Sequence, residues 1–159
     1  MGFNQGNTRT YAGISYGKVV RRVKEPTTDG LIKSEPREND KGDLIHELKY
    51  PTFTGKLVDL FISDDRGYGE NLCMVFRDGE ELFEIQTGFT KRYSSSFLCK
   101  LPNLDLTTPF ELDPYGFKSD EDKWVVGCNI YQNNNKLLNY FSKDDPKDLP
   151  QGEQLKNGT

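Results

Sequence analysis

Histidine is almost absent from this sequence, and cysteine is scarce and widely spaced. His46 is the single histidine, which leaves little scope for histidine-based metal sites or catalytic triads. Cys73, Cys99 and Cys128 lack the paired spacing of a zinc site, and an odd number of cysteines does not suit a disulfide framework. The sequence therefore predicts free thiols in a reducing compartment, with no metal and no cofactor.

Long apolar runs are also missing. No stretch approaches the roughly 18 residues of a membrane-spanning helix. The first seven residues lack the basic-then-apolar layout of a signal peptide. We therefore expect a soluble protein that is made in a cytoplasm and has no membrane partner.

Acidic residues are absent from the first 24 positions, although the whole chain has a net charge of −4. Five cations lie in this segment: Arg9, Lys18, Arg21, Arg22 and Lys24. The rest of the chain carries the remaining 16 of the 21 basic residues and all 25 acidic ones. A local basic stripe attracts phosphate within about a Debye length, roughly 8–10 Å, whatever the net charge. The overall acidity therefore does not exclude a polyanionic ligand.

Aromatic and β-branched residues supply most of the strand-like runs in the chain. We expect strands over residues 11–24, 44–50, 55–63, 71–77, 81–87, 110–112, 124–132 and 136–142. A long loop is expected over residues 25–43, which are rich in acids and contain two prolines. Tyr93, Phe97 and Leu101 recur at helical spacing before Pro102, which predicts a short helix over residues 93–101.

Short strands joined by hairpins, with one short helix, predict an all-β fold. A helix between the third and fourth strands favours an OB-fold-like five-stranded Greek-key barrel, to which an extra N-terminal strand and the 25–43 loop are added. We expect this domain to span residues 11–143, between a flexible N-terminal arm at 1–10 and a flexible C-terminal tail at 144–159.

Four stretches of the chain resemble a family of phage-encoded single-stranded-DNA-binding proteins. They are residues 13–21, 54–60, 97–106 and 136–150, and they occur in the order typical of that family. The resemblance implies an OB fold and sequence-tolerant binding of single-stranded DNA during replication or recombination, in the cytoplasm of the bacterial host. It also implies replication or recombination proteins as partners and leaves self-association open. The alternative is a small all-β viral structural or protein-interaction module that binds no nucleic acid.

Binding single-stranded DNA without base readout needs cations for the phosphates and exposed rings for the bases. If residues 11–24 form one strand, Tyr16, Lys18 and Arg22 share a face, whereas Arg21 lies on the other. We expect the first of these faces to bind DNA. A basic, β-branched edge strand that resists aggregation is the alternative interpretation.

A second candidate cluster precedes the predicted helix. Lys91 and Arg92 lie between Phe89 and Tyr93, where they could hold a phosphate near the free amides of the helix N-terminus. Alternatively, the two rings cap the bottom of the barrel and the two cations are solvated.

Two further aromatic residues, Tyr68 and Trp124, have different expected places. Tyr68 lies between two glycines at a predicted hairpin tip, which makes it a candidate for base stacking or an ordinary turn residue. Trp124 begins a strand and is expected to lie in the core.

An enzymatic interpretation rests on Glu47 and Lys49, whose Glu-x-Lys spacing has the form of a nuclease metal motif. That motif needs another acid on an adjacent strand, and the available candidates, Asp29 and Asp40, fall in the predicted loop. We therefore expect no catalytic residues and a protein that is not an enzyme.

Overall fold

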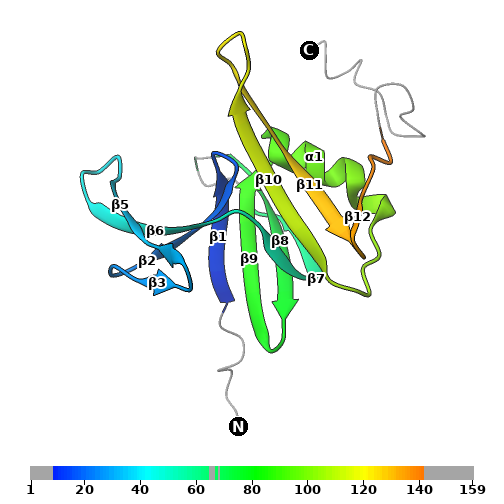
Figure 1. Ribbon diagram of the computed structural model, residues 1–159, viewed down its shortest axis with the longest axis horizontal. Coiled ribbons are helices and arrows are strands. Elements are labelled where there is room, and N and C mark those ends of the chain that lie inside the picture. Colours follow the sequence, from blue (N-terminus) through cyan, green and yellow to red (C-terminus); the bar gives the residue numbers. More distant parts are fainter. Residues whose placement is uncertain (1–8, 65–66, 68, 142–159) are drawn as a thin grey trace.

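A computed structural model describes residues 9–64, 67 and 69–141 of the chain (Figure 1). Most of these residues lie in strands, and a 3-10 turn over Leu101–Asn103 follows the α-helix. The elements are β1 (Arg9–Ser15), β2 (Lys18–Val23), β3 (Thr28–Asp29), β4 (Ile32–Lys33), β5 (Glu35–Glu38), β6 (Leu44–Tyr50), β7 (Phe53–Ile62), β8 (Asn71–Asp78), β9 (Glu81–Gly88), α1 (Arg92–Lys100), β10 (Phe110–Lys118), β11 (Trp124–Gln132) and β12 (Asn135–Lys136). The predicted mostly-β fold with one short helix is confirmed for the described residues.

Ten of the strands form one mixed sheet in the order β12-β11-β10-β7-β8-β9-β1-β2-β6-β5. Within it, β10-β7-β8-β9 follow the spatial order 4-1-2-3 of a Greek key. The connection from β9 back to β10 contains α1, so the helix lies between the third and fourth strands of this unit, as predicted.

The predicted closed five-stranded barrel is wrong, because the sheet does not close and β12 and β5 lie at its two ends. The second edge of β9 is taken by β1, in the one parallel pairing of the large sheet among the described residues. Beyond β1, the strands β2, β6 and β5 continue to one side of the molecule (blue to cyan in Figure 1). The N-terminal segment therefore extends the Greek-key unit sideways.

The prediction of one strand over residues 11–24 is wrong, because this segment is the hairpin β1–β2. Tyr16 and Gly17 form its two-residue loop with φ angles of 49° and 76°, and positive φ at both central positions is the requirement of a type I′ turn. Asparagine before glycine is the usual sequence signal for such a turn. Tyrosine in its place makes the segment resemble an uninterrupted strand.

The expected loop over residues 25–43 also contains strands. β3 and β4 form a separate two-stranded hairpin, and β5 pairs with β6 along Glu35–Glu38. These strands are only two to four residues long and mostly exposed, so they lack the apolar alternation by which a strand is recognised.

The core lies between the inner face of the sheet and α1. Tyr93 and Phe97 point from the helix into this core, which confirms the predicted helical spacing. β10 pairs with β11 along nearly its whole length. A strand is expected over residues 136–142. In the part of this segment that the structure describes, strand pairing is limited to β12, at Asn135–Lys136.

Cys73, Cys99 and Cys128 are all free, as predicted. Burial raises the pKa of the Cys128 thiol to about 12. In the part of the chain that the structure describes, no helix is long and apolar enough to cross a membrane.

The tip of the β1–β2 hairpin is fixed against the Greek-key unit. The Gly17 amide donates a buried hydrogen bond of 2.9 Å to the Tyr93 hydroxyl at the start of α1. A Cβ atom on Gly17 would lie only 2.6 Å from the backbone nitrogen of Gly116 in β10. Glycine at position 17 therefore serves both the turn and a close backbone contact.

Candidate nucleic-acid interface

Strand alternation in β2 separates the cations that the sequence places side by side. Val20 lies opposite Lys49 of β6 and Arg22 lies opposite Glu47, so Lys18 and Arg22 project from the outer face of the sheet. The half-buried Arg21 lies opposite Leu48 and projects from the inner face. Lys18 and Arg22 thus share a face as expected, whereas Arg21 lies apart from them.

A further cation on the outer face comes from β5. The Arg37 guanidinium donates two hydrogen bonds, of 3.1 and 3.0 Å, to the carboxylate of the buried Glu47. These hydrogen bonds from Arg37 keep the pKa of Glu47 below its ordinary value. The pair holds the planar guanidinium in place and neutralises the acid that would otherwise repel a phosphate.

Two adjoining hollows form a groove on this face, with volumes of about 560 and 530 Å³. Both are lined by Ser15, Val20, Arg37 and Glu47, which makes them continuous. We call this outer groove, together with the third hollow described below, the hairpin groove. The side chains in its first two hollows that suit nucleic acid are the cations Lys18, Arg22, Arg37 and Lys49 and the rings of Tyr11 and Tyr16.

Three of these four cations are available to a ligand, whereas Arg37 is paired with Glu47. Lys18 and Arg22 have no ion pair with any residue that the structure describes. Lys49 makes one contact of 3.4 Å to Glu35, and both side chains are exposed. Because exposed ion pairs contribute at most about 1 kcal/mol, a phosphate can replace that carboxylate.

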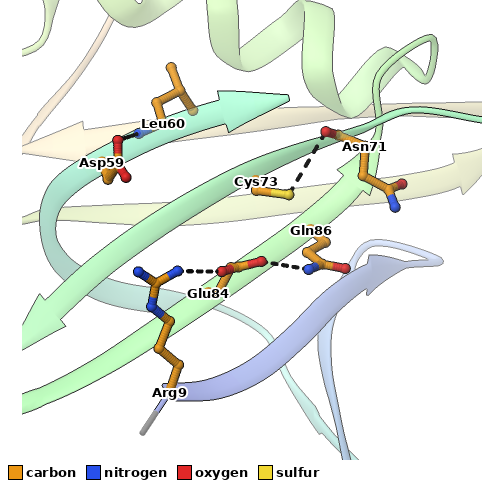
Figure 2. Close-up of polar contacts among 7 residues, drawn as sticks. All are labelled: Arg9, Asp59, Leu60, Asn71, Cys73, Glu84 and Gln86. Atoms are coloured by element: carbon orange, nitrogen blue, oxygen red, sulfur yellow. Dashed lines mark hydrogen bonds and ion pairs between the residues drawn. The ribbon is translucent and has the colours of Figure 1, made fainter. Parts of the chain in front are cut away.

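The next acid along the sheet, Glu84 of β9, is also neutralised. Figure 2 shows Arg9 and Gln86 reaching its carboxylate from opposite sides, at 2.7 and 2.5 Å. Glu84 is buried, and Gln86 lines the hairpin groove beside Tyr11. The groove therefore presents an amide here rather than a negative charge.

Tyr16 and Lys18 line the same hollow. Strand alternation, the predicted cause, is wrong, because Tyr16 lies in the turn and not in a strand. Its side chain is 72% exposed, on a backbone whose positive φ is unfavourable for any residue with a Cβ atom. A bulky exposed ring at such a position costs stability without filling the core. Backbone strain of this kind concentrates at functional sites.

Trp124 is not in the core, contrary to the prediction. It is 49% exposed, and its ring meets that of Tyr16 edge-on, with centroids 5.2 Å apart. β11 brings the indole to the hairpin tip because β10, its partner, carries the Gly116 contact with Gly17. Two exposed rings from segments far apart in the chain therefore lie together.

Lys91 belongs to this end of the hairpin groove. A third hollow, of about 370 Å³, is lined by Lys91, Tyr16, Trp124 and Tyr93. The aliphatic stem of Lys91 lies over Gly88, where a Cβ atom would be 2.8 Å from its Cγ atom. The absence of a side chain at Gly88 thus lets the lysine lie against the backbone beside the rings.

The other members of the predicted 89–93 cluster have different places. Phe89 packs against the core, and Tyr93 is buried with its hydroxyl bonded to Gly17. Burial is the main cause of the raised pKa of Tyr93. Arg92 is exposed at the start of α1 and is not among the residues that line the three hollows. Tyr68 lies outside the described residues.

The nuclease interpretation of Glu47 and Lys49 finds no support in these contacts. Arg37 occupies both oxygens of Glu47, and Asp29 instead accepts a hydrogen bond of 2.6 Å from Tyr50. No group of three or more potential metal ligands occurs among the residues that the structure describes.

In comparisons with known proteins, no family model, no curated protein and no solved structure matches this chain.

Sequence reasoning missed Arg37, Lys49 and Trp124. The first two lie in segments where acids are frequent, so the neighbouring charges hide them until the pairing of β2, β6 and β5 is known. Trp124 follows Lys123 directly after a polar turn, and that polar setting is the only sequence signal for its exposure.

The Arg37–Glu47 pair leads to a pH prediction. Since the pKa of Glu47 is lowered in the folded protein, the ion pair stabilises the fold above the ordinary carboxyl pKa near 4.5 and loses that effect as the pH falls through the lowered value. Glu47→Gln should therefore lower the melting temperature by several degrees at pH 7, and the difference should shrink toward pH 3. Calorimetry across this range tests it, with the exposed Glu35→Gln as control. A melting-temperature difference that stays constant with pH would contradict the assignment.

Proposed function

We propose that this protein binds single-stranded DNA without base-specific readout and coats it during phage replication or recombination. The observation that carries the proposal is the hairpin groove, where Lys18, Arg22, Arg37, Lys49 and Lys91 lie among the exposed rings of Tyr11, Tyr16 and Trp124. Cations that follow a phosphate backbone and rings that accept bases are the two parts such binding needs.

The rings favour a single strand over a duplex. Tyr11, Tyr16 and Trp124 are each about half exposed or more, so their faces are accessible to unpaired bases. In a duplex the base faces are already stacked on one another and cannot reach these side chains. The charge pattern restricts where DNA can bind, because the acidic remainder of the chain repels DNA outside the groove.

The strand order supports an OB-like assignment within this proposal. β7, β8 and β9, then α1, then β10 and β11 follow the order expected of an OB fold, and β7 pairs with both β8 and β10. In such folds the outer face of the second and third strands binds oligonucleotides. β1 and β2 extend this face beyond β9, which is where the hairpin groove lies. The proposed setting is the cytoplasm of a bacterial host, with replication or recombination proteins as partners.

The decisive measurement is a titration with labelled oligo-dT against a matched duplex. Because Trp124 is the only tryptophan, its fluorescence also reports directly on the groove and should be quenched by stacked bases. With three to five phosphate contacts, the logarithm of the binding constant should fall against the logarithm of salt concentration with a slope of roughly −2 to −3.5. Equal binding of the duplex, or no binding at low salt, would refute the proposal.

A structural or protein-interaction module is the second candidate, and one observation favours it. Phe117 and Val125 are exposed at the outer face of the β10–β11 hairpin, where Tyr115 stacks on Phe117 with centroids 6.2 Å apart. An apolar patch of this kind suits a protein surface. The oligo-dT titration separates the two candidates, since this one predicts no preference for single-stranded DNA.

A further inference from the structure

A cavity of about 300 Å³ lies on the inner side of the β1–β2 hairpin, opposite the hairpin groove. Val19 of β2 lines it and alternates with the groove residue Val20, while Ala12 of β1 borders both spaces. The backbone of the hairpin therefore separates the two sites. We call this space the inner cavity.

The interior of the inner cavity is apolar and aromatic. Val19 and Ile85 are buried, and the rings of Phe53 and Phe83 meet edge-on with centroids 5.2 Å apart. Walls of this kind favour a flat ring over a branched aliphatic group, because an aromatic ring gains both buried area and favourable edge or face contacts.

The mouth of the inner cavity is polar and carries both charges. Arg21 lies beside Tyr50, whose hydroxyl donates a hydrogen bond of 2.6 Å to Asp29. Burial and this carboxylate raise the pKa of Tyr50, so the hydroxyl stays protonated. Glu81 adds a second acid. Donors and acceptors thus surround an apolar interior, as in small-molecule sites.

We propose that the inner cavity binds a neutral nitrogen-containing aromatic ring, of the class of a nucleobase or nucleoside. Its volume is at the lower end of the range for small-molecule sites, which suits one ring system and excludes a peptide or an oligonucleotide. Phe53 and Phe83 would contact the ring, while Arg21 and the Tyr50–Asp29 pair would hydrogen-bond to its polar edge. The mouth carries two carboxylates, Asp29 and Glu81, and one guanidinium, Arg21, so its negative charge disfavours a phosphate there.

Ligand binding in the inner cavity does not depend on the proposed DNA binding. The two sites differ in their expected preference for a phosphate group on the ligand. The inner cavity should prefer adenosine to adenosine monophosphate, whereas the hairpin groove, lined by cations, should prefer the monophosphate.

The test is an amide NMR titration of the full chain with adenosine, with adenosine monophosphate and with ribose. Adenosine should shift the amide signals of Phe83 and Ile85 but not those of Lys18 and Lys49. The monophosphate should bind the cavity at least threefold more weakly, and ribose should shift neither set. Shifts confined to the groove, tighter cavity binding of the monophosphate, or no shift of Phe83 and Ile85 at millimolar adenosine would overturn the proposal.

The adjacent arginines supply a matched pair of variants, since Arg21 lines the inner cavity and Arg22 lines the groove. Arg21→Gln should weaken adenosine binding several-fold and leave binding of oligo-dT unchanged, whereas Arg22→Gln should do the reverse. Ala12→Leu, which fills the cavity, should abolish adenosine binding in protein whose amide spectrum remains folded. Equal effects of the two arginine variants on adenosine would contradict a separate site.

Discussion

Replacing Tyr16 by asparagine should weaken the binding of single-stranded DNA by roughly 5- to 150-fold, the equivalent of one stacked base at about 1–3 kcal/mol. The ring is 72% exposed at the hairpin tip and lies against Trp124, so its removal takes away one stacking surface and leaves the second without support. No cation of the groove is changed. The salt dependence of binding should therefore keep its slope while the affinity falls.

Asparagine is chosen because it separates binding from folding. It tolerates the positive φ of this turn better than tyrosine and is the preferred residue before glycine in a type I′ loop. That gain offsets the lost ring contact with Trp124, so stability should stay within about 1 kcal/mol of the wild type. Fluorescence anisotropy with labelled oligo-dT measures the affinity, and thermal unfolding measures the stability. Leu31→Asn, at the fully exposed tip of the β3–β4 turn, serves as control. Unchanged affinity for the Tyr16 variant would exclude the turn from the interface.

Replacing Gly17 by alanine should lower the free energy of unfolding by about 3 kcal/mol, which combines the strain of a positive φ with overlap against backbone atoms. A Cβ atom here would lie 2.6 Å from the Gly116 nitrogen and 3.0 Å from the Tyr115 carbonyl carbon, neither of which can rotate away. The hairpin tip must move, and the Gly17–Tyr93 hydrogen bond is then lost. For a domain of this size we expect a fall in melting temperature of roughly 10 °C.

Gly13 in the same hairpin supplies the matched control. A Cβ atom at this position would lie 3.5 Å from the Gln86 carbonyl oxygen, an ordinary contact, and the φ angle of Gly13 is not positive. Gly13→Ala should therefore change stability by less than about 1 kcal/mol. Thermal unfolding of the two variants side by side tests the close contact between β1–β2 and β10. Equal effects would show that the loss comes from chain entropy and not from this contact.

The two hairpin variants also test how the groove is built. The third hollow joins residues of the hairpin tip to Lys91 and to Trp124 of β11, and only the docked tip keeps them together. Gly17→Ala should therefore weaken DNA binding even though it removes no side chain that contacts DNA. Gly13→Ala adds one methyl group to the lining of the groove but keeps the tip docked, so it should weaken binding much less than Gly17→Ala does.

Local chemistry was a reliable guide where a signal is contained in a few neighbouring residues. The spacing of Tyr93 and Phe97 predicted the helix, and a run of strand-forming residues predicted β6 with its bounds unchanged. Where the usual local signal is replaced, the prediction failed. Tyrosine in place of asparagine concealed the 16–17 turn. β3 and β4 were not predicted because each is only two residues long and buries no apolar face.

The candidate site depends far more on tertiary structure. Lys18 and Arg22 were identified from their own strand, since alternation places residues two apart on one face. Their companions Arg37, Lys49 and Trp124 come from β5, β6 and β11, and only the pairing register and the Gly17–Gly116 contact bring them there. The same register takes Arg21 to the other face of the sheet and into the inner cavity.

By itself, the sequence determined three things: the near absence of histidine, the wide spacing of free cysteines, and an N-terminal segment with five cations and no acid. These are properties of composition and order along the chain, and folding does not change them. Tertiary structure decided which charges face a ligand and which are cancelled. It pairs the acids Glu47 and Glu84 with Arg37 and Arg9 and leaves Lys18 and Arg22 without an ion pair to any described residue. The physical reason is that an ion pair acts over a few ångströms in space, and strand pairing alone sets those distances between residues far apart in the chain.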